Sequence, residues 1–98
     1  MAAIDWLEIG GQKFSKAEAR QASDFKEILD NFELEKDVVF GLFRDSVLPI
    51  PKRLVLTQIA SLDDVAGMLP NEEDPRIIGV IQHRLREARK DGSSGVTH

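Results

Sequence analysis

Hydrophobic residues recur at helical spacing in several stretches of the chain, and these stretches predict its main elements. Between Lys16 and Asn31 the apolar positions follow intervals of three and four, which places them on one face of a helix. Ser15 precedes this stretch and Glu18 follows three residues later, which is the pattern of a capping box. The sequence therefore predicts a helix from Lys16 to about Asn31. Its expected buried face consists of Ala22, Phe25, Ile28, Leu29 and Phe32.

Residues 4–14 favour a β-hairpin whose two-residue turn is Gly10-Gly11. The flanking Trp6 and Phe14 are good strand formers. A short helix that ends at Gly10 is the alternative. An isolated hairpin is only marginally stable, so its apolar side is expected to pack on the helices.

The middle of the chain predicts a second helix, from Glu35 to Ser46. Its apolar residues give it a wide hydrophobic face, and acids cluster at its start, where the helix dipole favours them. Gly41 weakens this prediction, so a buried strand over residues 38–43 is the alternative. Pro49 and Pro51 must interrupt the helix, because a proline disfavours helical conformation in the residue before it.

A third helical stretch is expected to open at Pro51, which suits the first position of a helix. Its helical spacing continues as far as Pro70, although residues 53–58 taken alone match a strand. Ser61 with an aspartate three residues later indicates that a separate short helix covers Leu62–Leu69.

The last helix is the segment with the strongest charge pattern. Asp74 and Pro75 are typical of a helix start, and Asp91-Gly92 predicts its end. From Pro75 to Lys90 it carries five basic residues and one acid, a net charge of +4. The whole chain has a net charge of −4, so the remaining residues together carry −8. We therefore expect one basic face on an otherwise acidic molecule.

A helical projection of this segment separates an apolar half from a basic half. Arg84 is the exception, because it falls inside the apolar stripe. There it must extend past its neighbours to solvent, pair with an acid of another helix, or point at a partner. The residues predicted to bind a partner are Arg76, Arg84, Arg86, Arg89 and Lys90, together with Trp6 on the N-terminal hairpin.

Length and composition limit the classes of protein that this chain can represent. Its 98 residues make one domain, which we expect over residues 1–91, followed by a flexible tail over 92–98. The chain has no cysteine, no apolar run long enough to cross a membrane and no positively charged N-terminal signal. These features favour a cytoplasmic protein that has no membrane partner. The pI near 5.1 argues against whole-molecule attraction to nucleic acid.

The polar residues predict neither a catalytic site nor a metal or cofactor site. The acids gather at predicted helix starts, where capping and the helix dipole explain them. His83 and His98 are the two histidines, and no second ligand lies at metal-binding spacing from either. Gly10-Gly11 has no lysine and Ser/Thr at the spacing of a phosphate loop.

Together these patterns predict a mainly α fold, a compact bundle of four to five short helices that could carry an N-terminal β-hairpin. The alternative fold is α+β, with strands near 38–43 and 53–58. The predicted function is a small non-enzymatic protein–protein interaction module, such as an adaptor, assembly factor or regulator. Two alternatives stay open: a nucleic-acid-binding regulator that uses the basic helix over 75–90, and a self-associating structural subunit.

Overall fold

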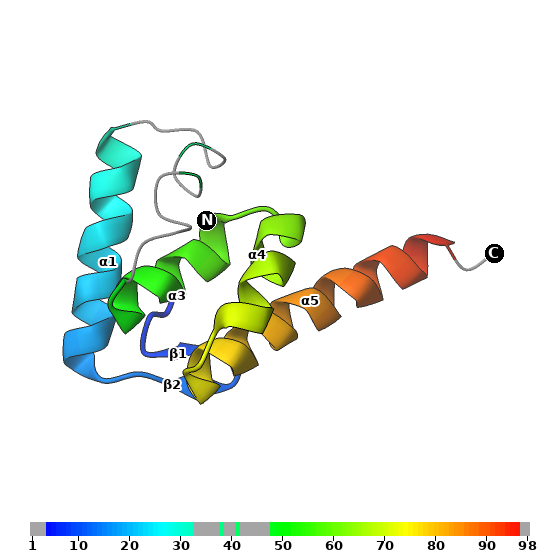
Figure 1. Cartoon of the computed structure of the whole chain (residues 1–98), viewed down its shortest axis with the longest axis horizontal. Helices are drawn as coiled ribbons and strands as arrows, with labels where there is room; N and C mark the ends of the chain where they lie inside the picture. The colour runs from blue at the N-terminus through cyan, green and yellow to red at the C-terminus, as the bar shows by residue number, and fades with distance from the viewer. Residues whose placement is uncertain (1–3, 33–37, 39–40, 42–47, 97–98) are drawn as a thin grey trace.

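The computed structural model describes residues 4–32, 38, 41 and 48–96, with side chains of the last helix described as far as Arg89. Helices dominate the architecture, and a two-stranded hairpin precedes them (Figure 1). This confirms the predicted mainly helical fold. In chain order the elements are β1 (Glu8–Ile9), β2 (Gln12–Lys13), α1 (Lys16–Asn31), α3 (Ile50–Ile59), α4 (Leu62–Met68), the 3-10 turn η1 (Leu69–Asn71) and α5 (Pro75–Val96).

The predicted hairpin is confirmed, and its two glycines explain its tight turn. Strands β1 and β2 run antiparallel, with Ile9 opposite Gln12. Gly10 and Gly11 have φ angles of 57° and 79°, a left-handed conformation that glycine adopts without steric cost. Ile9 and Phe14 are buried in the core with the helices, whereas Ile4 and Leu7 are exposed, so the two strands do not depend on each other alone.

Helix α1 begins and ends where the sequence predicts. The Ser15 hydroxyl accepts a hydrogen bond from the Glu18 N–H, and the Glu18 carboxylate accepts one from the Ser15 N–H, which completes the capping box. Two members of the predicted buried stripe are misplaced, because Ile28 is 51% and Phe32 is 70% exposed. The observed buried face is narrower than the predicted one, and it begins and ends nearer the N-terminus of the helix. It consists of Ala19, Ala22, Phe25 and Leu29.

Helix α3 lies at the centre of the fold, in contact with both α1 and α5. Its consecutive Leu54, Val55 and Leu56 are all buried, which is expected of a helix that other elements cover on several sides. The same burial makes residues 53–58 resemble a strand in the sequence, and the strand alternative is wrong there. Ile50 begins the helix, so Pro51 stands in its first turn and not at its first position.

Two predictions for the middle of the chain lie largely outside the described residues. They are the helix over Glu35–Ser46 and its alternative, the strand over 38–43. Val38 and Gly41 are described there, and both are helical. The next prediction is confirmed, since α4 covers Leu62–Met68 and Ser61 caps its start.

Helix α5 begins as predicted and ends later than predicted. The Asp74 carboxylate accepts hydrogen bonds from the N–H groups of Arg76 and Ile77, which caps the first turn. The helix then continues to Val96, so the predicted end at Asp91-Gly92 is wrong. Glycine weakens a helix by about 1 kcal/mol without ending it, unless it takes the left-handed C-cap conformation. Flexibility of residues 92–98 stays a prediction.

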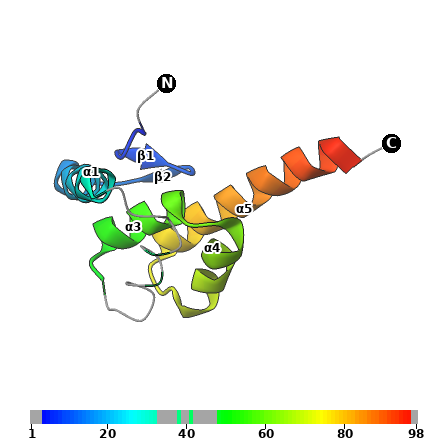
Figure 2. The ribbon, with the colours of Figure 1, turned by 90° about the horizontal axis from the view of Figure 1, so that it is seen from above.

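The hydrophobic core joins α3, α4 and the first half of α5 with one face of α1 and the hairpin. Its most enclosed side chains on α5 are Ile77, Val80 and Ile81, none of which is more than 1% exposed. Figure 2 shows the other half of α5 extending away from this core, on the side of the molecule opposite to α1. The core therefore fixes one end of α5 and leaves the other end outside the body.

Candidate interaction surface on the last helix

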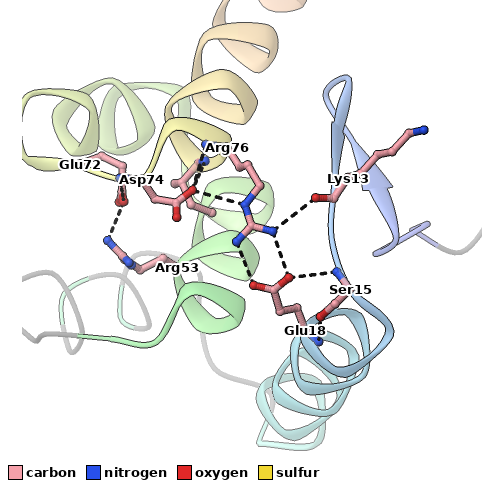
Figure 3. A network of polar contacts seen from close by, with 8 residues as sticks. Lys13, Ser15, Glu18, Arg53, Glu72, Asp74 and Arg76 are labelled. Carbon is pink, nitrogen blue, oxygen red and sulfur yellow. Dashed lines mark hydrogen bonds and ion pairs between the residues drawn. The ribbon is translucent and has the colours of Figure 1, made fainter.

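The first of the predicted partner-binding residues, Arg76, lies in a network of polar contacts inside the molecule (Figure 3). Its guanidinium forms a bidentate ion pair with Glu18. Nη1 lies 3.0 Å from Oε1 of the carboxylate, and Nη2 lies 2.9 Å from Oε2. Nη1 also donates to the backbone carbonyl of Lys13, at 3.4 Å. The guanidinium carbon stands 4.9 Å from the ring centre of Phe14, within cation–π range. Arg76 thus connects the start of α5 to both the hairpin and α1.

This network lowers the pKa of Glu18 to about 2 from its usual 4.5. The hydrogen bond from Arg76 is the largest cause, and the backbone N–H of Ser15 is the next. The same pair raises the pKa of Arg76 above its ordinary value. Glu18 therefore stays ionised at any physiological pH, where it both caps α1 and binds Arg76.

Arg84 is also held inside the molecule, in an arrangement that differs from all three expected for it. Its Nη1 donates to the backbone carbonyls of Thr57 at 2.7 Å and Ala60 at 2.6 Å. Thr57 lies in the last turn of α3, and Ala60 is the C-cap of that helix. The guanidinium therefore satisfies carbonyls at a helix end, where the dipole favours a positive charge. Burial lowers the pKa of Arg84 from its ordinary value.

A third arginine, outside the predicted set, makes a similar internal contact. Arg53 of α3 donates to the carboxylate of Glu72, whose side chain is only 4% exposed. That carboxylate also accepts the N–H of Asp74, so it joins α3 to the start of α5. Arg53 Nε is buried and has no hydrogen-bond partner among the residues that the structure describes. Here, as at Asp74, acids that cluster in the sequence have structural roles at helix starts, as predicted.

The hairpin turn packs directly on the first half of α5. A Cβ at Gly10 would lie 3.2 Å from both the Val80 Cα and the His83 Cβ. A Cβ at Gly79 would lie 2.5 Å from the amide nitrogen of Gln12. Small residues on both sides therefore allow the close approach.

Trp6 is half-buried against the hydrophobic core. Packing accounts for this burial. The prediction that Trp6 binds a partner has no test among these contacts.

The two remaining arginines of the predicted set, Arg86 and Arg89, have a different environment. Arg86 and Arg89 are exposed, and neither forms an ion pair or hydrogen bond with the described part of the chain. Both belong to the C-terminal half of α5. Figures 1 and 2 show this half of the helix projecting from the body. Lys90 follows the two arginines, and its side chain lies outside the described residues. The basic patch is therefore defined here as Arg86 and Arg89.

The structure thus divides the predicted partner-binding arginines into two with internal contacts and two that are exposed. Residue type alone does not show this division. The projection of the last helix marked Arg84 as unusual, but nothing in the sequence indicated that its acceptors were backbone carbonyls. The capping box identified Glu18 as a capping residue. The ion pair of Glu18 with Arg76 joins residues 58 positions apart. Sequence spacing on one helix carries no signal for such a contact.

The comparison of the chain with family models, curated proteins and solved structures gave no match. None of the described helices combines the length and apolar character that crossing a membrane requires. Among the described residues, no group of three or more His, Asp or Glu side chains is placed to hold a metal ion.

Proposed function

We propose that this protein is a small non-enzymatic interaction module, an adaptor, assembly factor or regulator, that contacts a partner protein through the basic patch on α5. One observation carries the proposal. The chain uses Arg76 and Arg84 for its own packing, whereas Arg86 and Arg89 are exposed on a projecting helix and form no ion pair with the described residues.

The chemistry of the basic patch favours a partner surface that carries carboxylates. Arginine presents a planar set of donors that matches a carboxylate with two parallel hydrogen bonds. One exposed ion pair contributes only about 0–1 kcal/mol to a binding free energy. The two arginines would therefore determine which partner binds more than how tightly it binds. Leu85 and Ala88 are partly exposed on the apolar half of this helix, next to the basic half, and Leu85 also packs against the core.

The nucleic-acid alternative would require α4 and α5 to act as a DNA-binding helix-turn-helix, and the observed packing is less compatible with that use. A recognition helix places its N-terminal residues in the major groove. In α5 that end is occupied, since Arg76 is bound to Glu18 and Ile77 is buried. We therefore keep nucleic acid as an outcome of the test below and not as a second proposal.

Co-purification from the native host tests the proposal, with wild type compared to Arg86→Glu/Arg89→Glu. We expect a partner protein that the wild type retains and the double variant loses. Lys13→Glu/Lys16→Glu is the matched control, because it makes the same change in net charge at two other exposed lysines. Circular dichroism should show that all three proteins are folded.

Retention of every partner by the Arg86/Arg89 variant would contradict the proposal. So would salt-dependent binding of duplex DNA through these two arginines in the absence of any protein partner.

A further inference from the structure

The exposed face of α1 carries a pair of acids that matches the basic patch in spacing. Asp24 and Glu27 are three residues apart on one helix, as Arg86 and Arg89 are on another. Both acids are exposed and form no ion pair or hydrogen bond with the described residues. Asp30 on the same helix differs, because Lys26 binds its carboxylate at 2.7 Å.

We propose that the partner of the basic patch is a second copy of this chain, in which Asp24 and Glu27 of one molecule receive Arg86 and Arg89 of the other. This inference rests on the proposed function and names its partner. Residues three apart on a helix lie on the same side of it, so two helices that carry opposite pairs at this spacing can match them side by side.

The position of the two pairs in the fold prevents them from meeting within one molecule. Helix α1 lies at one end of the long dimension, and the projecting end of α5 lies at the other (Figures 1 and 2). Two molecules placed side by side in opposite directions would bring each acidic pair to a basic patch. A two-fold axis makes this contact twice and closes the assembly as a dimer.

Exposed apolar side chains beside the acids would add buried apolar surface to an interface that ion pairs alone would not provide. Ile28 follows Asp24 by one turn and is 51% exposed, and Phe32 follows one turn later at 70%. On α5, Leu85 and Ala88 are partly exposed on the apolar half of the helix, and Leu85 also packs against the molecule's own core. An interface with apolar residues between ion pairs resembles the surfaces that hold stable dimers. Arg20 stands one turn before Asp24 and marks the end of the acidic stretch.

The charge distribution of the whole chain favours the same partner. Arg86 and Arg89 are exposed on α5, whereas the chain as a whole has a net charge of −4, so each molecule presents both signs. Opposite fields of this kind steer encounters between two molecules, and salt weakens them.

A charge-exchange experiment on the full chain tests the inference, with the molar mass measured by light scattering at low and high salt. At low salt we expect the wild type to reach twice the chain mass of 11.0 kDa, and the mass should fall toward one chain as salt rises. Arg86→Glu/Arg89→Glu alone and Asp24→Arg/Glu27→Arg alone should each remain a single chain at low salt.

Restoration of the dimer is the decisive arm. In an equimolar mixture of the two reversed variants, each mixed dimer has two contacts. At one contact the introduced acids of the first variant meet the introduced arginines of the second. At the other contact the original acids and arginines are paired. We expect the mixture to recover the two-chain mass, as should one chain that carries all four reversals. Lys13→Glu/Lys16→Glu should keep the wild-type mass, and circular dichroism should show each variant folded. The neutral pair Arg86→Gln/Arg89→Gln offers a milder change should the reversals unfold the protein.

A wild type that stays a single chain at low salt and high concentration would overturn the inference. A dimer that both reversals leave intact, or a mixture that does not recover it, would do the same. The proposed function fails separately, when Arg86→Glu/Arg89→Glu retains every partner from the host. A single-chain wild type that loses a host protein on this reversal would therefore contradict the second copy and support the module.

Discussion

The two halves of α5 have similar residue types and different environments. In the first half, Ile77, Val80 and Ile81 are enclosed by the core, and Arg76 is bound to Glu18. In the second half, from Gln82 to Arg89, no side chain is fully buried. Arg84 belongs to the first half in its contacts, because its guanidinium reaches back to the end of α3. A count of basic residues on this helix therefore overstates its basic surface.

The largest expected difference between the halves is in core packing. Ile81→Ala removes a fully buried side chain and should lower the free energy of unfolding by about 2–5 kcal/mol. The matched change Leu85→Ala, one turn later, removes a partly exposed side chain and should cost about half as much or less. Urea denaturation followed by circular dichroism measures both. Equal losses would show that Leu85 is packed as tightly as Ile81, and would contradict the difference between the two halves.

The next largest effect concerns the arginines. Arg84→Met keeps the length of the side chain and removes the donors to Thr57 and Ala60, so it should destabilise the protein by about 2 kcal/mol. Arg89→Met should change the free energy of unfolding by no more than about 0.5 kcal/mol, since the arginine is exposed. Similar values for the two variants would remove the distinction between a structural arginine and a surface arginine.

A smaller and pH-dependent effect is expected at Glu18. Glutamine keeps the capping box but removes the charge, so Glu18→Gln should cost about 1 kcal/mol at neutral pH through the partly exposed pair with Arg76. The pKa of Glu18 is lowered from 4.5 to about 2 in the folded state, so the unfolded state binds more protons between these values. The advantage of the wild type is therefore complete above about pH 4.5 and is lost as the pH falls toward 2.

Urea denaturation of both proteins at a series of pH values would show this change. A stability difference between wild type and Glu18→Gln that does not vary with pH would contradict the ion pair at the start of α5.

The smallest expected effect comes from the glycine under the hairpin. Gly79→Ala gains helix propensity but places a methyl group against the side chain of Gln12. At Gly67 in α4 a Cβ meets nothing within 4 Å, so Gly67→Ala should stabilise the protein by roughly 0.5–1 kcal/mol. We expect Gly79→Ala to fall short of this gain by about 1 kcal/mol or less. Thermal unfolding compares the two, and equal gains would mean that Gln12 moves aside freely.

Local patterns predicted the local structure well. The capping box at Ser15, the glycine turn at Gly10 and the cap at Asp74 depend on neighbours within a few residues, and each is confirmed. The end of α5 was misjudged because a glycine ends a helix only in a particular conformation. The exposure of Ile28 and Phe32 was missed because periodicity gives the direction of a helix face but not its width.

The candidate site was less accessible to sequence reasoning. Arg76 and Arg86 look alike in the sequence, and only the fold shows that one of them meets Glu18. The acceptors of Arg84 are backbone carbonyls 24 and 27 residues away, which no pattern of side chains can indicate. Contacts of this kind are set by how α3 and α5 cross, which is a tertiary property.

Hydrogen–deuterium exchange along α5 at low and high salt tests the division of this helix most directly. In the first half, the amides of residues 77–81 should be strongly protected at both salt concentrations, because the core must open before they exchange. In the projecting half, the amides of residues 85–89 should exchange fast at high salt and become protected at low salt, when the second copy binds. Equal protection of the two halves at both salt concentrations would contradict the division of α5 into a structural half and an interaction half.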